Sequence, residues 1–489
     1  MRRQITEAGW RFDNSYARLP APLFERAPPV PVRAPAIIVL NEPLAAELGL
    51  DADVLREAGA PVFAGNEVPP GAEPIAQAYA GHQFGHFTNL GDGRAILLGE
   101  QMAPAGSRHD VQLKGAGRTR YSRGGDGRAA LGPMLRELIV SEGMHALGIP
   151  TTRSLAVAAT GEAVLRNAPL PGAVLTRVAA SHIRVGTFQY AAAIEDHAAL
   201  AALLDHAITR HDPRLAAADD RAAAFLDAVV ERQAALVARW MLVGFVHGVM
   251  NTDNMAVSGE TIDYGPCAFL DAYDPATVFS SIDRDGRYAY ANQPAIAHWN
   301  LARLAESLLP LMPGPPEQAV ERLREVLALF PTRYERHHRA GARAKLGLAA
   351  EEAEDGELFA TLLRRMHESR ADFTTTFAGL ARRVETAEDA DAGCGPVGGE
   401  WLAAWRTRLA REPGPPAAVV ARLRRANPVV IPRNHRVEES LAAAEAGDLV
   451  PLRRLLAAIR QPFAETPDNE PYRAGPPPGA GPYRTFCGT

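Results

Sequence analysis

Cysteine is scarce in this chain of 489 residues. Its three cysteines, Cys267, Cys394 and Cys487, are too few and too scattered for a disulfide scaffold or a zinc cluster, so the pattern favours reduced thiols. A basic excess is also missing, because 52 Lys and Arg stand against 57 Asp and Glu. The resulting net charge of −5 gives no electrostatic reason to expect a nucleic-acid partner.

Long apolar runs are missing as well. The longest, residues 240–246, is far too short to cross a bilayer. The first ten residues, MRRQITEAGW, include two arginines but no apolar core of a secretory signal. We therefore expect a soluble cytoplasmic protein without a membrane partner. The length allows two or three packed subdomains.

The character of the sequence changes along the chain, and five segments are expected. Residues 1–74 are Pro-rich, with a short helix expected at NEPLAAELGL. Residues 75–190 are predicted to form strands and turns around one strong helix. Residues 191–330 and 331–470 are predicted to be mostly helical, and the Pro- and Gly-rich tail, residues 471–489, to be mobile. This is an α+β fold class.

Within residues 75–190, the strong helix is predicted to begin after Gly132, with Pro133 at its first position, and to end near residues 148–150. The string SLAVAATGEAVLR predicts a hairpin that turns at residues 160–161, followed by a strand at GAVLTRVA. A β-rich part followed by an α-rich part is the layout of two-lobed, protein-kinase-like folds, here with additional N- and C-terminal segments.

The segment of residues 247–265 reads HGVMNTDNMAVSGETIDYG and predicts a metal site. A tight hairpin that turns at residues 258–259 would place Asn254 directly opposite Asp263. An amide oxygen and a carboxylate at that separation can share one hard cation, and Mg²⁺ prefers such ligands together with water and phosphate oxygens. Taken alone, a solvated polar hairpin end explains the pattern equally well.

The spacing in this segment is typical of protein kinases. His247 precedes Asn254 by seven residues, as in the kinase catalytic loop, and the triplet DYG at 263–265 has the form of the metal-binding DFG. The position of the kinase catalytic Asp is occupied by Val249, however. The usual base is therefore missing, and Asp253 is the nearest substitute.

A second group of residues predicts phosphate binding. Lys114 ends the predicted strand VQLK, and Glu137 lies 23 residues later in the predicted helix, as in the kinase Lys–Glu pair. Alone, each would be read as an ordinary surface residue. Glycines let the backbone approach phosphate, and arginines bind phosphate oxygens bidentately. Such residues are Gly91, Gly93, Arg94, Arg118, Arg120, Arg123, Gly127 and Arg128, with Asp126 among them and with Arg177 and Arg184 as further cations of the same cleft.

Several longer strings resemble blocks of one known family. YAGHQFGHFTNLGDGR, QLKGAGRTRYSRGGDGRA, HGVMNTDNM and DYGPCAFLDAYDP are similar to the selenoprotein O family, in its bacterial cysteine-containing branch. The blocks run from residue 79 to residue 274, and weaker similarity covers most of the chain. Members of that family are pseudokinases that bind ATP in a flipped orientation and transfer AMP to protein hydroxyls. Arg120, where Pro is common, and the opening of the Glu137 helix are small departures from the pattern.

The resemblance implies a protein adenylyltransferase that moves AMP from ATP to Ser, Thr or Tyr hydroxyls and releases pyrophosphate. It implies that Asp253 accepts the proton, that Asn254 and Asp263 hold Mg²⁺ (with Mn²⁺ as the alternative), and that Glu137 pairs with Lys114. The nucleotide contacts implied by the resemblance are Gly91, Gly93, Arg94, Lys114, Asp126, Gly127, Arg177 and Arg184.

The resemblance also implies regulation and partners. Cys487 stands where relatives carry selenocysteine, and a reversible, redox-sensitive bridge between Cys267 and Cys487 follows from the family pattern. Redox-homeostasis proteins are the expected substrates, and a monomer is expected. Two other functions remain open: ordinary phosphoryl transfer, which must explain Val249, and a non-catalytic ATP-binding scaffold, which the intact set of ligands disfavours.

Overall fold

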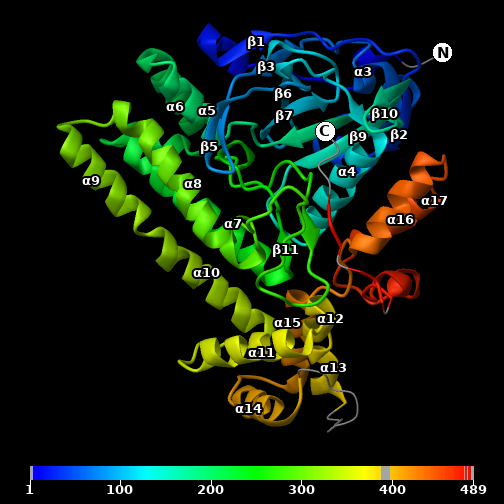
Figure 1. Cartoon of the computed structure of the whole chain (residues 1–489), viewed down its shortest axis with the longest axis vertical. Coiled ribbons are helices and arrows are strands. Elements are labelled where there is room, and N and C mark those ends of the chain that lie inside the picture. Colours follow the sequence, from blue (N-terminus) through cyan, green and yellow to red (C-terminus); the bar gives the residue numbers. More distant parts are fainter. Residues whose placement is uncertain (1–3, 387–396, 478, 482, 486–489) are drawn as a thin grey trace.

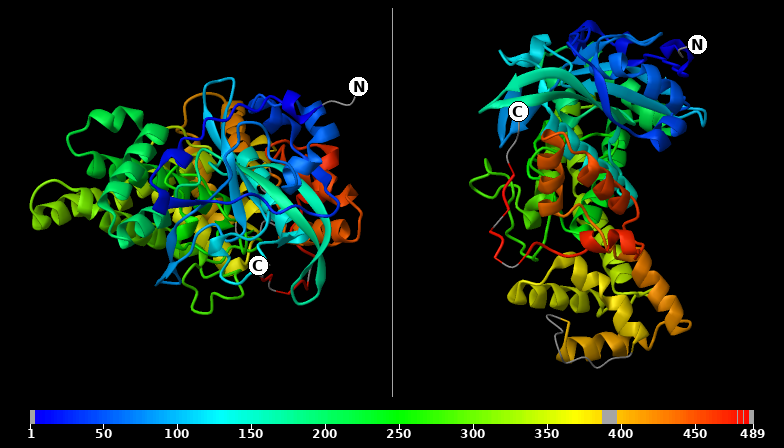
Figure 2. Two further views of the ribbon diagram at one scale, coloured as in Figure 1. Left: turned by 90° about the horizontal axis from the view of Figure 1, so that it is seen from above. Right: turned by 90° about the vertical axis from the view of Figure 1, so that its right-hand side faces the viewer.

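The computed structural model describes residues 4–386, 397–477, 479–481 and 483–485. The expected mixture of helices and strands is confirmed. A twisted antiparallel sheet lies at one end of the molecule and a group of helices, α11–α15, at the other, with the long helices α7 and α10 running between them (Figures 1 and 2). Among the described residues, no helix is both long and apolar enough to cross a membrane.

The main sheet has the strand order β1-β3-β6-β7-β10-β9-β2, with β8 added beside β10. Every pair of neighbouring strands is antiparallel. The strands are β1 (Phe24–Arg26), β2 (Ala36–Leu40), β3 (Ile75–Gln77), β6 (Ala95–Met102), β7 (Arg108–Lys114), β8 (Ala129–Ala130), β9 (Arg153–Leu165) and β10 (Pro169–Ala179). Two short pairs lie outside it: β4 (Ala80–Gln83) with β5 (His86–Asn89), and β11 (Phe245–Val246) with β12 (Ala268–Phe269).

Helices cover both faces of the sheet, which is why its central strands β6, β7 and β10 are buried over most of their length. One face packs against α1 (Glu42–Glu47), α2 (Ala52–Ala58) and α3 (Ala60–Ala64). The other face packs against α4 (Leu131–Ala146), which is itself covered by α16 (Asn434–Glu445) and α17 (Val450–Ile459). The three layers hold the strands that carry Lys114 and Arg177 in a rigid frame.

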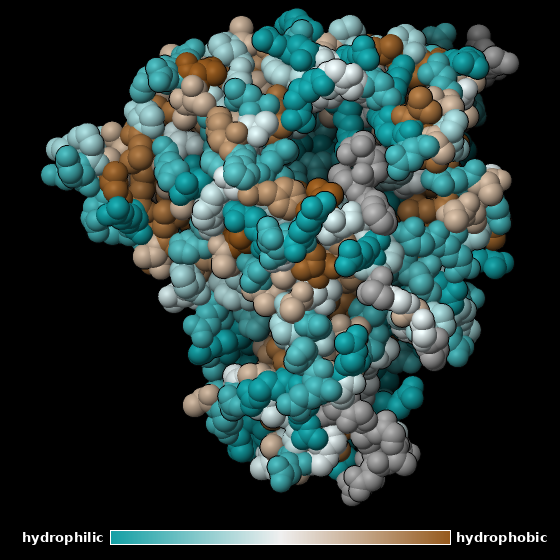
Figure 3. Space-filling model, viewed as in Figure 1, coloured by the Kyte–Doolittle hydropathy of each residue, from teal (hydrophilic) through white to brown (hydrophobic). Residues whose placement is uncertain are grey.

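The remaining helices form the larger core. They are α5 (Val185–Ala193), α6 (His197–His211), α7 (Arg221–Val243), α8 (Gln293–Leu308), α9 (Pro316–Leu327), α10 (Phe330–Lys345), α11 (Asp355–Ser369), α12 (Phe373–Ala378), α13 (Leu380–Glu385), α14 (Gly399–Leu409) and α15 (Pro416–Ala426). Helix α7 is apolar on most sides near its end and is buried there, as its sequence indicates. The face shown in Figure 3 is mostly hydrophilic, with hydrophobic residues scattered over it.

The strong helix predicted from the sequence is α4, but it begins earlier than predicted. Its first residue is Leu131 and its N-cap is Ala130, so Pro133 occupies the third position rather than the first. Proline is tolerated there because the N–H groups of the first turn have no partner inside the helix. The helix ends at Ala146, close to the predicted stop. The short helix predicted at NEPLAAELGL is also confirmed, as α1, capped by Asn41.

The predicted hairpin turn at residues 160–161 is wrong. Strand β9 continues through this point to Leu165, and the chain turns at residues 166–168 before β10 begins. Gly161 does adopt a positive φ of 68°, but it forms a bulge opposite Gly172 instead of a turn. A glycine in a left-handed conformation serves either purpose, so the local sequence is ambiguous.

The described residues near the end of the chain contact the rest of the molecule. Thr485 pairs with Ser280 in a parallel bridge, and its hydroxyl donates to the Pro266 carbonyl at 2.7 Å. The Tyr483 hydroxyl lies 2.9 Å from Arg136 Nη1, on α4. The last described residues therefore contact the segment that follows the DYG triplet.

Candidate active site

One cavity of about 490 Å³ gathers the residues predicted to act on the nucleotide. It lies between the sheet and the segment that joins β11 to β12, which closes as a loop because those two strands pair with each other. All predicted nucleotide, proton-accepting and metal residues line it: Gly91, Gly93, Arg94, Lys114, Asp126, Gly127, Arg177, Arg184, Asp253, Asn254 and Asp263. Residues more than 170 positions apart in the sequence thus line the same cavity.

Asp263 lies at the centre of a charge cluster. Its carboxylate is 2.8 Å from Lys114 Nζ, 2.7 Å from Arg177 Nη1 and 2.5 Å from Arg184 Nη1. Lys114 Nζ also lies 2.6 Å from Glu137 Oε2, so the predicted Lys–Glu pair is present. The Asp263 backbone has a φ of 64°, which is unusual for a residue other than glycine and often marks a functional position.

The charges of this cluster fix the protonation state of Asp263. Burial by itself would raise the pKa of its carboxyl, but the attraction of Lys114, Arg177 and Arg184 outweighs burial and holds the pKa well below its ordinary value. Asp263 therefore stays ionised. Three cations outnumber the two carboxylates of Glu137 and Asp263, which leaves positive charge in the cavity for phosphate oxygens.

Asp253 has a carboxylate oxygen free for a reacting group. Its side chain is buried, and among the described residues Oδ1 has no hydrogen-bond partner. Burial raises the pKa of Asp253 to about 6, so the carboxylate is largely ionised near neutral pH yet able to accept a proton. An orphaned acceptor of this kind is costly inside a protein unless something binds it.

The β4–β5 hairpin packs directly on Asp253 and its neighbours. The His82 N–H donates to Thr252 Oγ1 at 2.7 Å, and the Phe84 N–H donates to Asn251 Oδ1 at 3.0 Å. A side chain at Gly81 would overlap the Asp253 carboxylate. The glycine is therefore needed where the hairpin backbone meets the proposed base.

His247 shapes the loop that carries Asp253 and Asn254 and is not among the residues that line the cavity. Its Nε2 lies 2.9 Å from the Ile262 carbonyl, which can only accept, so Nε2 carries the proton and Nδ1 accepts from the Val249 N–H at 3.4 Å. Burial lowers the pKa of His247, which keeps the ring neutral. Asn254 donates its Nδ2 to the Val249 carbonyl at 2.9 Å, which leaves its Oδ1 for a cation.

The hairpin predicted to pair Asn254 with Asp263 is wrong, although both residues line the same cavity. The turn exists, with Gly259 at a φ of 80°, but the flanking residues pair elsewhere. Ala256 bridges Arg184, and Thr261 bridges Thr151. Asn254 itself ends a 3₁₀ turn over Thr252–Asn254. Long-range partners, not a local ladder, place both residues at the same cavity.

The loop of residues 118–128, rich in arginine and glycine, contributes only some of its predicted residues to the lining of the cavity. Arg123 and Arg128 line the cavity, whereas Arg118 and Arg120 are not among its lining residues. The Asp126 carboxylate is held 2.8 Å from Arg166 Nη1. Gly91 has a φ of 115°, and a side chain there would overlap the Tyr121 ring. The loop that carries Gly91 can therefore pack closely on the loop that carries Tyr121 only because this residue is a glycine.

Sequence reasoning missed several lining residues. The Tyr79 ring lies 4.7 Å from the Arg184 guanidinium, and Asp92 is buried between Gly91 and Gly93. Both residues belong to the string YAGHQFGHFTNLGDGR, so their place in that string could have indicated that they line the cavity. Arg166 was missed for a structural reason, because the turn that carries it begins six residues later than predicted.

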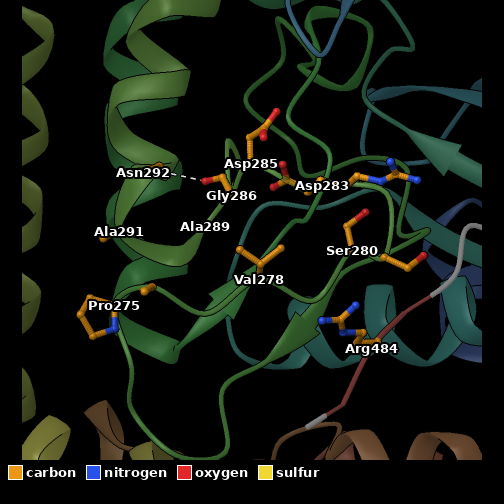
Figure 4. A pocket seen from close by; sticks show the side chains of 13 residues that line it. Pro275, Val278, Ser280, Asp283, Asp285, Gly286, Ala289, Ala291, Asn292 and Arg484 are labelled. Atoms are coloured by element: carbon orange, nitrogen blue, oxygen red, sulfur yellow. Dashed lines mark hydrogen bonds between the residues drawn. The ribbon is translucent and has the colours of Figure 1, made fainter.

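Figure 4 shows the residues that line a second cavity, of about 830 Å³. The segment of residues 275–292 and Arg484 line it, and none of the predicted site residues does. Ile282 lies within this segment but lines the first cavity instead, and its side chain is 53% exposed. Asp283 is not a free ligand here, because its oxygens accept the N–H groups of Arg287 at 2.9 Å and Tyr288 at 2.8 Å.

The residues present fit a divalent cation. Asn254 Oδ1 and the Asp263 carboxylate are hard oxygen donors of residues that line the same cavity, and phosphates and water can complete the shell of such an ion. Among the described residues, no group of three or more His, Cys, Asp or Glu side chains could hold a metal alone. A cation held here would therefore depend on the nucleotide for part of its coordination.

Comparisons with known proteins agree with this site. A family model described as protein adenylyltransferase SelO matches residues 9–460. The chain is 59% identical to the protein nucleotidyltransferase YdiU of Geobacillus kaustophilus, over 99% of this chain and 100% of that protein. It is 58% identical to the protein of the same name from Bacillus cytotoxicus and 56% identical to that of Rhizobium etli, each over 99% of this chain and 98% of the relative.

These matches identify an enzyme of the nucleotidyltransferase class, as predicted. The chain belongs to the protein adenylyltransferase SelO family. The resemblance stated from the sequence strings is thereby confirmed.

Proposed function

We propose that this protein transfers AMP from ATP to Ser, Thr or Tyr hydroxyls of protein substrates and releases pyrophosphate. The observation that carries the proposal is the single cavity that unites an unpartnered Asp253 oxygen, a cluster of three cations and the oxygen donors Asn254 and Asp263. The strands and helices around the cavity support a protein-kinase-like, two-lobed arrangement. One proposed lobe spans residues 75–190 and the other spans residues 191–330. The segments 1–74, 331–470 and 471–489 flank these two lobes.

The reaction is a displacement at the α-phosphorus. The acceptor oxygen forms a bond to this phosphorus, its proton passes to Asp253, and the bond to the β-phosphate oxygen breaks. Pyrophosphate leaves with that electron pair. The cations Lys114, Arg177 and Arg184 counter the charge that develops on the phosphates, because preorganised charges in a partly dry site need little reorganisation. Val249 at the usual position of the kinase base argues against ordinary phosphoryl transfer.

Nucleotide binding must rearrange the ion pairs around Asp263. In the structure, Lys114, Arg177 and Arg184 all bind its carboxylate. Phosphate oxygens compete for these cations, and each cation hydrogen bond that passes from Asp263 to a phosphate oxygen frees part of the Asp263 carboxylate. Asn254 and Asp263 would then hold Mg²⁺, or Mn²⁺, which supplies charge neutralisation at the phosphates. The remaining proposed nucleotide contacts are Gly91, Gly93, Arg94, Asp126 and Gly127.

Transfer can be tested with ATP labelled at either end. The purified protein, Mg²⁺ and a protein acceptor such as casein are incubated with ATP carrying ³²P at the α- or at the γ-phosphate. We expect label from the α-phosphate to enter protein together with release of pyrophosphate. Label that enters protein only from the γ-phosphate would establish a kinase, and tight ATP binding without either label in protein, after a screen of acceptors, would favour a scaffold.

Redox control through a Cys267–Cys487 bridge belongs to the same proposal. Cys267 is buried, and burial raises the pKa of its thiol to about 12, so it is a poor nucleophile while enclosed. Cys394 and Cys487 lie outside the described residues. The bridge, a preference for redox-homeostasis proteins as substrates and a monomeric state remain predictions. Peptide mapping of oxidised protein that finds both thiols free would overturn the bridge.

A further inference from the structure

Arg177 is the most enclosed cation of the cavity, with a side chain only 1% exposed. Four of its five N–H groups have partners within the described residues. Nη1 donates to Asp263 at 2.7 Å and to Glu137 at 3.2 Å, Nη2 donates to Gln112 Oε1 at 2.6 Å, and Nε donates to His182 Nε2 at 3.2 Å. Two of these partners are carboxylates and two are neutral groups.

The neutral imidazole of His182 is oriented from behind. Because a guanidinium can only donate, His182 Nε2 must accept, and the ring proton therefore sits on Nδ1. Nδ1 faces Asp110 Oδ2 at 3.2 Å, and this carboxylate also accepts the His182 backbone N–H at 2.8 Å. Asp110 is itself held by Arg210 at 2.9 Å. A carboxylate behind the ring thus presents the lone pair of His182 to Arg177.

The amide of Gln112 is oriented in the same manner. Its Oε1 accepts from Arg177, so its Nε2 is the donor that lies 3.1 Å from Asp92 Oδ2. The Gln77 backbone N–H holds the same Asp92 oxygen at 3.2 Å. An amide turned the other way would bring its oxygen toward a carboxylate and its donors toward a guanidinium. Asp92 therefore fixes which end of Gln112 faces Arg177.

We propose that His182 and Gln112 are positioning residues for the transfer reaction, which hold the Arg177 guanidinium in the plane that meets the nucleotide phosphates. The proposal rests on the proposed function, in which Arg177 binds the nucleotide. Both residues are neutral, so they restrict the side chain without cancelling its charge. A free arginine side chain loses rotamer entropy when it is fixed. Here that loss is met during folding, before ATP arrives.

The test measures binding of α,β-methylene ATP with Mg²⁺ by calorimetry, because this analogue cannot lose its AMP group. His182→Phe, which keeps a ring but removes the acceptor, is expected to weaken binding about tenfold. His182→Gln retains an acceptor oxygen and should stay within about threefold of the wild type. Gln112→Met should weaken binding about fivefold. His206→Phe is the matched control, since the His206 Nε2 has no partner among the described residues, and it should bind normally.

A double-mutant cycle separates positioning from a general structural role. If His182 acts through Arg177, His182→Phe causes no further loss in an Arg177→Ala background. The same factor of loss in both backgrounds would overturn the proposal, as would a His182→Phe protein that binds like the wild type. Should His182→Phe fail to fold, judged by its melting curve, the same cycle with Gln112→Met distinguishes the two roles. Unchanged binding by Arg177→Ala would instead refute the nucleotide contact in the proposed function.

Discussion

At the scale of single residues, the site contains two carboxyl groups whose pKa values are shifted in opposite directions by their surroundings. Asp263 is surrounded by cations, which keep the pKa of its carboxyl low and its charge permanent. Asp253 is buried with an unpartnered oxygen, and burial raises its pKa to about 6. Environments that separate two carboxyl groups in this way are typical of sites where one group holds charge and the other moves a proton.

Removing the Asp263 carboxylate should abolish transfer. Asp263→Ala deletes one of the two proposed metal donors and leaves Lys114, Arg177 and Arg184 without their shared anion. We expect a loss of AMP transfer of at least a hundredfold, measured with α-labelled ATP. Asp285→Ala, an exposed acid in the neighbouring cavity, is the control and should transfer normally. Full activity in Asp263→Ala would show that the metal assignment is wrong.

Glu260 should make stability depend on pH. Burial raises its pKa from 4.5 in the unfolded chain to about 7. A raised carboxyl pKa favours the folded state below about pH 4.5, and that contribution is lost as the pH rises through about 7. This loss of folding free energy is on the order of 2 kcal/mol, since the Glu260 side chain is partly exposed and solvent screening reduces the effect of its pKa shift.

The neutral isostere Glu260→Gln tests this pH dependence. Its free energy of unfolding in urea, relative to the wild type, should rise between pH 5 and pH 8 because the variant lacks the titrating group. The backbone N–H of Ala180 and the Ser258 hydroxyl can still bond to the amide. An equal difference between variant and wild type at both pH values would contradict a raised pKa for Glu260.

At the scale of elements, some features could be predicted from the sequence and others could not. Helix α4 could be, because its apolar face and the glycine after its end are local signals. The β9–β10 turn could not, since Gly161 gives the same local signal for a bulge as for a turn. Asn254 and Asp263 were predicted to share a site through a hairpin. They do share it, but through bridges to Arg184 and Thr151, which no local pattern reveals.

The β4–β5 hairpin offers a test at this scale. Gly81→Ala places a methyl group where the Asp253 carboxylate lies, so the hairpin or the base must move. We expect transfer to fall at least tenfold while the melting temperature changes by only a few degrees. Gly356→Ala in α11 is the matched control, because nothing surrounds that position, and alanine should stabilise the helix slightly. Normal activity of Gly81→Ala would mean that the hairpin does not constrain Asp253.

At the scale of the whole molecule, the cavity exists because distant parts of the chain meet. The sheet brings Lys114 and Arg177, the β4–β5 hairpin covers Asp253, and the β11–β12 pair closes the segment that holds Asn254 and Asp263. The last described residues contact the same segment through Thr485. Motif spacing predicted residues that line this cavity, whereas their network of neutral and charged partners required the three-dimensional structure.

We propose above all that this cavity directs attack to the α-phosphate. The most direct measurement is the position of the label that enters an acceptor protein when the wild-type enzyme and Asp263→Ala are each incubated with α- or γ-labelled ATP. We expect the wild-type enzyme to incorporate label from α-labelled ATP only, with a mass increase of one AMP on a hydroxyl side chain, and Asp263→Ala to incorporate none. Incorporation from γ-labelled ATP alone would contradict it.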